Sequence, residues 1–194
     1  MPEQPPAGTG GTLITLAPAA SPLGHLLRAA IDAEQVGASR IHLALDQPDF
    51  LAVVAGLRRQ TGLVITTDPG HPEVDLVDRL PPDFYEMVLD EGPSDIDLVA
   101  QVVRIAEERD GEISLGGRGR AAVPVLYSAL AVGAHLVVGT AQTPPTPPSN
   151  DLRGDGRPVG RDDAALVARA SGLARIAGRA PLEGRFARGR WRVG

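Results

Sequence analysis

The chain has 194 residues, enough for one domain with a single sizeable core, and a globular composition of 43% hydrophobic and 22% charged residues. A formal net charge of -5 and an aromatic content of 3% argue against nucleic-acid binding, which uses cationic patches and aromatic stacking platforms. The sequence contains no lysine and no cysteine, which excludes Schiff-base, P-loop-lysine and thiolate chemistry as well as disulfides. It shows no apolar run of the ~20 residues that span a bilayer and no signal-peptide pattern, so we expect a cytoplasmic protein without a membrane partner.

The predicted elements alternate between short β-rich runs and helical runs. Residues 1–11 are rich in proline and glycine and predict a disordered leader. A single domain is expected over 12–182, followed by a basic C-terminal tail over 183–194. Helices are expected between the strands and after the last one, and a long loop rich in Pro, Gly, Asp and Arg is expected over 143–160. The expected strands cover 12–17, 40–45, 63–67, 84–89, 113–115 and 136–138.

Six βα units predict an α/β fold with a shortened, TIM-barrel-like core. A complete eightfold barrel typically needs about 250 residues. Either two units are missing and a partner covers the open sheet edge, or the strands form a smaller, half-open barrel. An uncovered parallel edge invites association with other chains, so we expect a homo-oligomer.

The stretch 111–142 is the first candidate for a functional site, because ligands of parallel sheets bind at the carboxyl ends of the strands. Gly116 and Gly117 follow one expected strand, and Gly139 and Thr140 follow the next. Glycines there let backbone amides approach a phosphate, which predicts a sugar-phosphate or nucleotide ligand. The alternative is that these glycines only form tight turns between strand and helix.

Four motifs occur in order along the chain: GASRIHL at 37–43, TT at 66–67 with Gly70, GRGRA at 117–121 and GAHLVVG at 133–139. The expected C-terminal helix, DDAALVARASGLARIAGRAPL, follows them. These motifs and this helix resemble the β-keto acid cleavage enzymes, with the 3-keto-5-aminohexanoate cleavage enzyme as the named representative. The resemblance covers most of residues 12–182, with a gap in the middle.

The resemblance implies a zinc-dependent TIM barrel that converts a β-keto acid and acetyl-CoA into acetoacetate and a new acyl-CoA. Zinc would act as a Lewis acid on the keto oxygen. His42 matches the first zinc-binding histidine of the family, and Arg120 matches an arginine expected to face the substrate carboxylate. Thr66, Thr67 and Arg118 are the further substrate-binding candidates.

The sequence departs from the family pattern at two of the three zinc ligands. Ala44 stands at the second histidine position, and Ala141 stands at the glutamate position. Asp46, four residues after His42 and on the same strand face, is the first substitute ligand. Other strand-end candidates are His71, Glu86 and Asp90. A non-catalytic paralogue that binds a metabolite or a full-length relative is therefore a third alternative.

Overall fold

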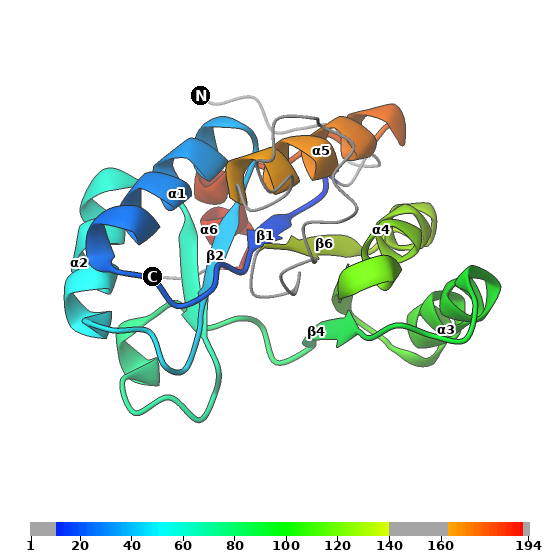
Figure 1. The fold of residues 1–194 in the computed structure, drawn as a ribbon, viewed down its shortest axis with the longest axis horizontal. Coiled ribbons are helices and arrows are strands. Elements are labelled where there is room, and N and C mark those ends of the chain that lie inside the picture. Colours follow the sequence, from blue (N-terminus) through cyan, green and yellow to red (C-terminus); the bar gives the residue numbers. More distant parts are fainter. Residues whose placement is uncertain (1–10, 140–162, 192–194) are drawn as a thin grey trace, which may run out of the picture.

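The computed structural model describes residues 11–139 and 163–191, and within them it contains one six-stranded parallel sheet (Figure 1). The order of the strands is β3-β2-β1-β6-β5-β4. Their bounds are β1 Ile14–Leu16, β2 Arg40–Leu43, β3 Val64–Thr67, β4 Phe84–Leu89, β5 Glu112–Gly117 and β6 His135–Val138.

The strand order is that of a barrel opened at one seam. The first strand pairs with both β2 and the last strand, β6, through Thr15, which lies opposite Arg40 on one side and Val137 on the other. The sheet therefore curls from β3 through β2, β1, β6 and β5 to β4, and β3 and β4 are its two edges. This is a shortened, TIM-barrel-like α/β fold with a half-open barrel, the second of the two architectures that the sequence allowed.

Helices cover the outer face of the curled sheet in the same order as the strands. In Figure 1, α1 and α2 lie over one half, α5 over the middle, and α4 and α3 over the other half, and neighbouring helices contact each other in that order. The α3 helix begins after Ser94, whose Oγ accepts a hydrogen bond from the Asp97 amide at 3.2 Å. The bounds are α1 Leu23–Gln35, α2 Phe50–Gln60, η1 Val74–Leu76, α3 Asp95–Glu108, η2 Gly119–Ala121, α4 Ala122–Ala131, α5 Asp163–Ile176 and α6 Gly184–Trp191.

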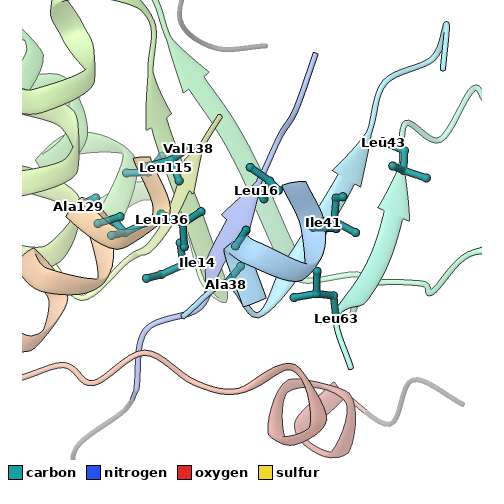
Figure 2. Packing of buried hydrophobic residues seen from close by; sticks show 14 of the residues in the cluster. Ile14, Leu16, Ala38, Ile41, Leu43, Leu63, Leu115, Ala129, Leu136 and Val138 are labelled. Atoms are coloured by element: carbon teal, nitrogen blue, oxygen red, sulfur yellow. The ribbon is translucent and has the colours of Figure 1, made fainter. Parts of the chain in front are cut away.

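The apolar core lies between the sheet and the helices rather than inside the barrel. Alternate strand residues point outward into this layer, where each side chain is almost completely buried and burial stabilises by roughly 1.5–3 kcal/mol. Because the core uses one set of alternate residues, the other set faces the barrel interior. The outward-facing residues labelled in Figure 2 include Ile14, Leu16, Ile41, Leu43, Leu115, Leu136 and Val138.

The open edge of β3 is covered by the chain itself. The Asp78 amide donates to the Ile65 carbonyl at 2.7 Å, and the Ile65 amide donates to Asp78 Oδ2 at 2.8 Å. Arg188 of α6 donates to the Leu63 carbonyl at 2.6 Å. These contacts occupy backbone groups that a partner strand would otherwise pair with, which protects the edge without an oligomer. The expected homo-oligomer stays a prediction.

The segment expected to be a basic tail contains the α6 helix, which closes the amino-terminal end of the barrel. Ala187 is completely buried in a small cluster with Leu13 and Val64. Gly184 lies so close to the strand entry that an added Cβ would be 2.3 Å from the Gly62 carbonyl oxygen. The expected leader up to residue 10 and the expected loop over 143–160 lie outside the described residues.

The glycine-rich turn expected after residue 115 begins two residues later than the sequence pattern indicates. The β5 strand continues through Gly116 and Gly117, both of which pair with β4. A Cβ on Gly116 would lie 2.7 Å from the Val137 carbonyl oxygen of the neighbouring strand. Glycine here permits a close approach of two strands as well as a turn.

Candidate functional site

A cavity of about 800 Å³ opens at the carboxyl ends of β2, β3 and β4. The loop and 3-10 helix after β3 form one wall, with Val77 and Asp78 among their contributions. The end of β1 and Arg118 after β5 complete the rim. In βα barrels this end of the strands carries the ligand, so the cavity is the candidate site.

A buried ion pair between Arg40 and Glu86 crosses the barrel interior and lines the cavity. Arg40 Nη2 donates to Glu86 Oε2, and only 1% of the Arg40 side chain and 22% of the Glu86 side chain is exposed. Burial lowers the pKa of the Arg40 guanidinium from its usual value, while the charge of Glu86 opposes that shift. Because β2 and β4 belong to different halves of the open sheet, the pair ties the halves together.

His42, two residues further along β2, lies in the same cavity between two carboxylates and a hydroxyl group. Its Nδ1 is 3.3 Å from Thr66 Oγ1 and 3.9 Å from Glu86 Oε1, and its Nε2 is 3.7 Å from Asp68 Oδ1. Burial lowers the pKa of His42 below 6.5, the charge of Arg40 adds to that shift, and Glu86 and Asp68 oppose it. The imidazole is therefore largely neutral at pH 7, the state in which it can accept a proton from a ligand.

Several buried polar atoms of the barrel interior have no hydrogen-bond partner among the described residues. They include Nε and Nη1 of Arg40 and the hydroxyl oxygens of Thr15 and Ser114. Thr15 is the register partner of Arg40, and Ser114 is the register partner of Glu86. Each hydroxyl therefore lies beside one member of the ion pair on the neighbouring strand.

The substrate-binding candidates from the sequence lie at the cavity. Thr66, Thr67 and Arg118 all line it. The Thr67 hydroxyl already donates to the Leu43 carbonyl at 2.9 Å. Arg118 Nη1 is 3.4 Å from Asp90 Oδ1 at the exposed rim. The substrate-binding role of these three residues stays a prediction.

Arg120 and Asp46 do not line this cavity. Arg120 is exposed in η2, and its backbone amide donates to Glu91 Oε1 at 3.0 Å. Asp46 is exposed in the loop after β2. His71 is also away from the cavity, because its ring stacks on Phe50 with 3.9 Å between the ring centroids.

The expected phosphate-binding glycines lie at the ends of β5 and β6. A Cβ on Gly117 would be 2.5 Å from the Ala121 carbonyl oxygen, where the chain turns into α4. A Cβ on Gly139 would be 2.1 Å from the Ala17 carbonyl oxygen. These close backbone contacts explain why glycine is needed for tight turns between strand and helix. The phosphate-binding role of Gly116, Gly117 and Gly139 stays a prediction. Thr140 lies outside the described residues.

The donor set does not fit the expected zinc site. Over residues 11–139 and 163–191, no three His, Asp or Glu side chains are grouped so that they could hold a metal ion. The two ring nitrogens of His42 face different carboxylates, and one of these, Glu86, is bound to Arg40. A tetrahedral zinc site needs three or four converging ligands, so His42 and Asp46 do not build one with their described neighbours.

Sequence analysis did not identify Arg40 as part of the candidate site, and it considered Glu86 only as a substitute metal ligand. The available signal was an arginine at the start of the expected strand over 40–45 and a glutamate inside 84–89. A charged residue within a buried strand requires a partner, and the partner could have been sought among the other strands.

Comparisons with known proteins leave the family open. No family model matches the chain, and no curated protein matches it. Among solved structures, the chain is similar to the (S)-3-O-geranylgeranylglyceryl phosphate synthase of Thermoplasma acidophilum, solved in complex with sn-glycerol-1-phosphate. The identity is 14%, the TM-score is 0.48, and the match covers 83% of this chain and 93% of that one.

These findings correct the resemblance to the β-keto acid cleavage enzymes. Neither sequence comparison returns that family, and the structural match is to a synthase of a different class, with a likeness that concerns the fold alone. The motifs that suggested the family are shown here to shape tight βα turns and strand contacts, which other parallel barrels also require. The β-keto acid and acetyl-CoA expectations are therefore wrong. The zinc expectation has no support among the described residues, and the catalytic role of Arg120 stays a prediction. Among the described residues no helix is long and apolar enough to cross a membrane.

Proposed function

We propose that this protein is a βα-barrel enzyme or binder whose ligand is a small phosphorylated molecule such as a sugar phosphate. The observation that carries the proposal is the large cavity at the carboxyl ends of the strands, with the exposed Arg118 at its rim. Arginine suits a phosphate because its planar group offers several donors and keeps its charge.

The turn after β5 supports a phosphate position near Arg118. The α4 helix begins just after this turn without a side-chain cap and without an acidic residue in its first turn, and the preceding η2 turn holds the Glu91 carboxylate, which accepts from the Arg120 amide at 3.0 Å. Gly117 has no side chain to obstruct the backbone at this point. The positive end of a helix beside a cation favours a dianionic group.

The remainder of such a ligand would reach His42. A neutral imidazole flanked by Asp68 and Glu86 can take up a proton and is stabilised in its charged form by both carboxylates. The arrangement suits proton transfer at a hydroxyl group or at a carbon beside a carbonyl group. If the protein is an enzyme, His42 is the group that we expect to move the proton.

Calorimetric titration with ribose 5-phosphate and with ribose tests the proposal. We expect ribose 5-phosphate to bind at least tenfold more tightly, because only the ester carries the phosphate. Arg118→Gln should lower its affinity about tenfold, whereas Arg120→Gln should change it less than twofold, since Arg120 is also exposed but does not line the cavity. Equal affinities for the two ligands would contradict the proposal.

A further inference from the structure

A second pocket, which we call the amino-end pocket, lies at the opposite end of the barrel from the candidate cavity. Its volume is about 270 Å³, and it is formed where β5 and β6 begin, beside the ends of α3 and α4. It shares no lining residue with the cavity at the carboxyl ends. The charged and titratable side chains that line it are Arg109, Glu112, His135, Arg179 and Arg190.

Direct contacts hold most of these side chains close together. Glu112 is 3.4 Å through its Oε2 from His135 Nε2, and its Oε1 forms an ion pair with Arg190 Nη2. Beside His135, the Ala134 carbonyl accepts a hydrogen bond from Arg179 Nη1 at 2.6 Å. Burial lowers the pKa of Arg179 from its usual value, and the positive charge of Arg190 adds to that shift, as expected for two guanidinium groups that lie near each other.

The amino-end pocket has an excess of positive charge. Three arginines line it with a single carboxylate, that of Glu112, which leaves two uncompensated charges while His135 is neutral. Arg109 has an aromatic neighbour rather than a carboxylate, because its guanidinium group lies 4.6 Å from the centre of the Tyr85 ring. The partial negative charges at the ends of α3 and α4, roughly half a unit each, reduce the excess without cancelling it.

The arginines of this pocket can be reached from solvent and still have hydrogen-bond donors to offer. Arg109 and Arg190 are exposed, and Arg179 is half-buried. A guanidinium group has five N–H donors. Arg179 uses one of them on the Ala134 carbonyl, and Arg190 directs one at Glu112. These contacts fix the two planar groups before a ligand arrives, which reduces the loss of side-chain entropy on binding.

We propose that the amino-end pocket binds a phosphate group, with Arg179 and Arg190 as its hydrogen-bond donors and Arg109 as a further positive charge. A phosphate dianion matches the charge excess, and its oxygens suit the parallel donors of arginine. The site is additional to the one proposed at the carboxyl ends of the strands. Because Arg190 belongs to α6 and Arg179 to the loop after α5, a bound phosphate would join these two segments and stabilise the end of the barrel that α6 closes.

Calorimetric titration of the full-length protein with inorganic phosphate tests the proposal, at pH 8 and at an ionic strength held constant with chloride. The titration uses Arg118→Gln, which weakens only the proposed phosphate position at the rim of the other cavity. In that background we expect phosphate to bind, and we expect Arg179→Gln or Arg190→Gln to lower its affinity at least tenfold. Arg175→Gln is the matched control, because Arg175 is exposed on α5 and does not line the pocket, and it should change the affinity less than twofold.

Glu112→Gln should have the opposite effect on phosphate binding. It removes the carboxylate of the pocket but keeps a side chain that can form hydrogen bonds with Arg190 and His135. We therefore expect the affinity for phosphate to rise at least threefold in the same Arg118→Gln background. If the arginines only held the fold together, this substitution would leave phosphate binding unchanged, and that result would overturn the inference.

The remaining outcomes separate this inference from the proposed function. If Arg118→Gln binds no phosphate, the inference is overturned, and the proposed function depends on its own test with ribose 5-phosphate. Binding that persists unchanged after Arg179→Gln and Arg190→Gln would also overturn the inference, because the ion would then lie elsewhere. Thermal unfolding provides a second measurement on folded variants: phosphate should raise the unfolding midpoint of Arg118→Gln and should not raise it once Arg190→Gln is added.

Discussion

The Arg40–Glu86 pair shows why residue chemistry inside this barrel differs from that of its outer face. On the outer face, alternate strand residues are aliphatic and could be anticipated from their pattern. Inside, a charged pair joins two strands that are not neighbours, and no local pattern predicts which arginine meets which glutamate. Sequence analysis located His42, Thr66 and Glu86 near strand ends, but it could not assemble them because their proximity depends on how the sheet closes.

Removing one member of the ion pair should lower the free energy of unfolding more than removing both members does. Arg40→Met leaves the mostly buried Glu86 carboxylate without its cation, and we expect it to lower the free energy of unfolding by about 3 kcal/mol. The double variant Arg40→Met with Glu86→Leu should regain most of that loss, because no isolated charge remains. Urea unfolding of both single variants and the double variant measures the coupling. Additive losses would show that the two charges do not interact.

Gly139 is required by the backbone at the end of β6. Its φ is +151° and an added Cβ would lie 2.1 Å from the Ala17 carbonyl oxygen, so Gly139→Ala should lower stability by roughly 2 kcal/mol or more. Gly172→Ala is a control with the opposite sign, because it lies in the α5 helix with nothing within 4 Å of the added carbon. It should raise stability by roughly 0.5–1 kcal/mol. Chemical denaturation of both variants provides the comparison.

At the scale of elements, the order and type of the strands and most helices could be predicted from periodicity, caps and breakers, with differences of a few residues at the ends. The β4 strand begins and ends where expected, and α3 starts after Ser94, a residue type that favours the N-cap position. The α6 helix could not be anticipated as a structural element, since its Arg-rich sequence has few apolar residues. It is held by contacts with distant strands, such as that between Arg188 and the Leu63 carbonyl.

The buried face of α6 should be essential to the amino-terminal end of the barrel. Ala187→Asp would place a carboxylate in the cluster with Leu13 and Val64, and we expect a loss of about 3 kcal/mol from the burial of an unpaired charge or from undocking of the helix. Arg185→Ala on the exposed side of the same helix should change stability by less than about 0.5 kcal/mol. Urea unfolding followed by circular dichroism distinguishes them, and similar losses for both would mean that α6 is not docked.

At the scale of the whole molecule, two histidines at opposite ends of the barrel interior act on stability in the same direction. His42 lies in the cavity at the carboxyl ends, and His135 lies near the amino end, where its Nδ1 accepts from the Leu13 amide at 3.2 Å and its Nε2 is 3.4 Å from Glu112. Burial lowers the pKa of both below 6.5, although Glu86 and Glu112 each oppose the shift. Both side chains are therefore less readily protonated in the folded protein than in the unfolded chain.

This difference makes the molecule less stable in mild acid. Above pH 6.5 both histidines are mostly neutral in the folded and unfolded states, so their protonation does not lower the free energy of unfolding. As the pH falls through 6.5, the unfolded chain takes up protons that the folded protein resists, so the free energy of unfolding decreases until the folded pKa values are reached. One unit below 6.5, each histidine accounts for a loss of up to about 1.4 kcal/mol.

Urea unfolding at pH 7.5 and pH 5.5 measures the effect. We expect the wild-type protein to be less stable at pH 5.5, by up to about 3 kcal/mol from the two groups together. His42→Gln and His135→Gln should each reduce the difference between the two pH values. His25→Gln is the control, because His25 is exposed on α1 and contacts neither interior site. A pH dependence that persists unchanged in the variant lacking both His42 and His135 would assign it to other groups.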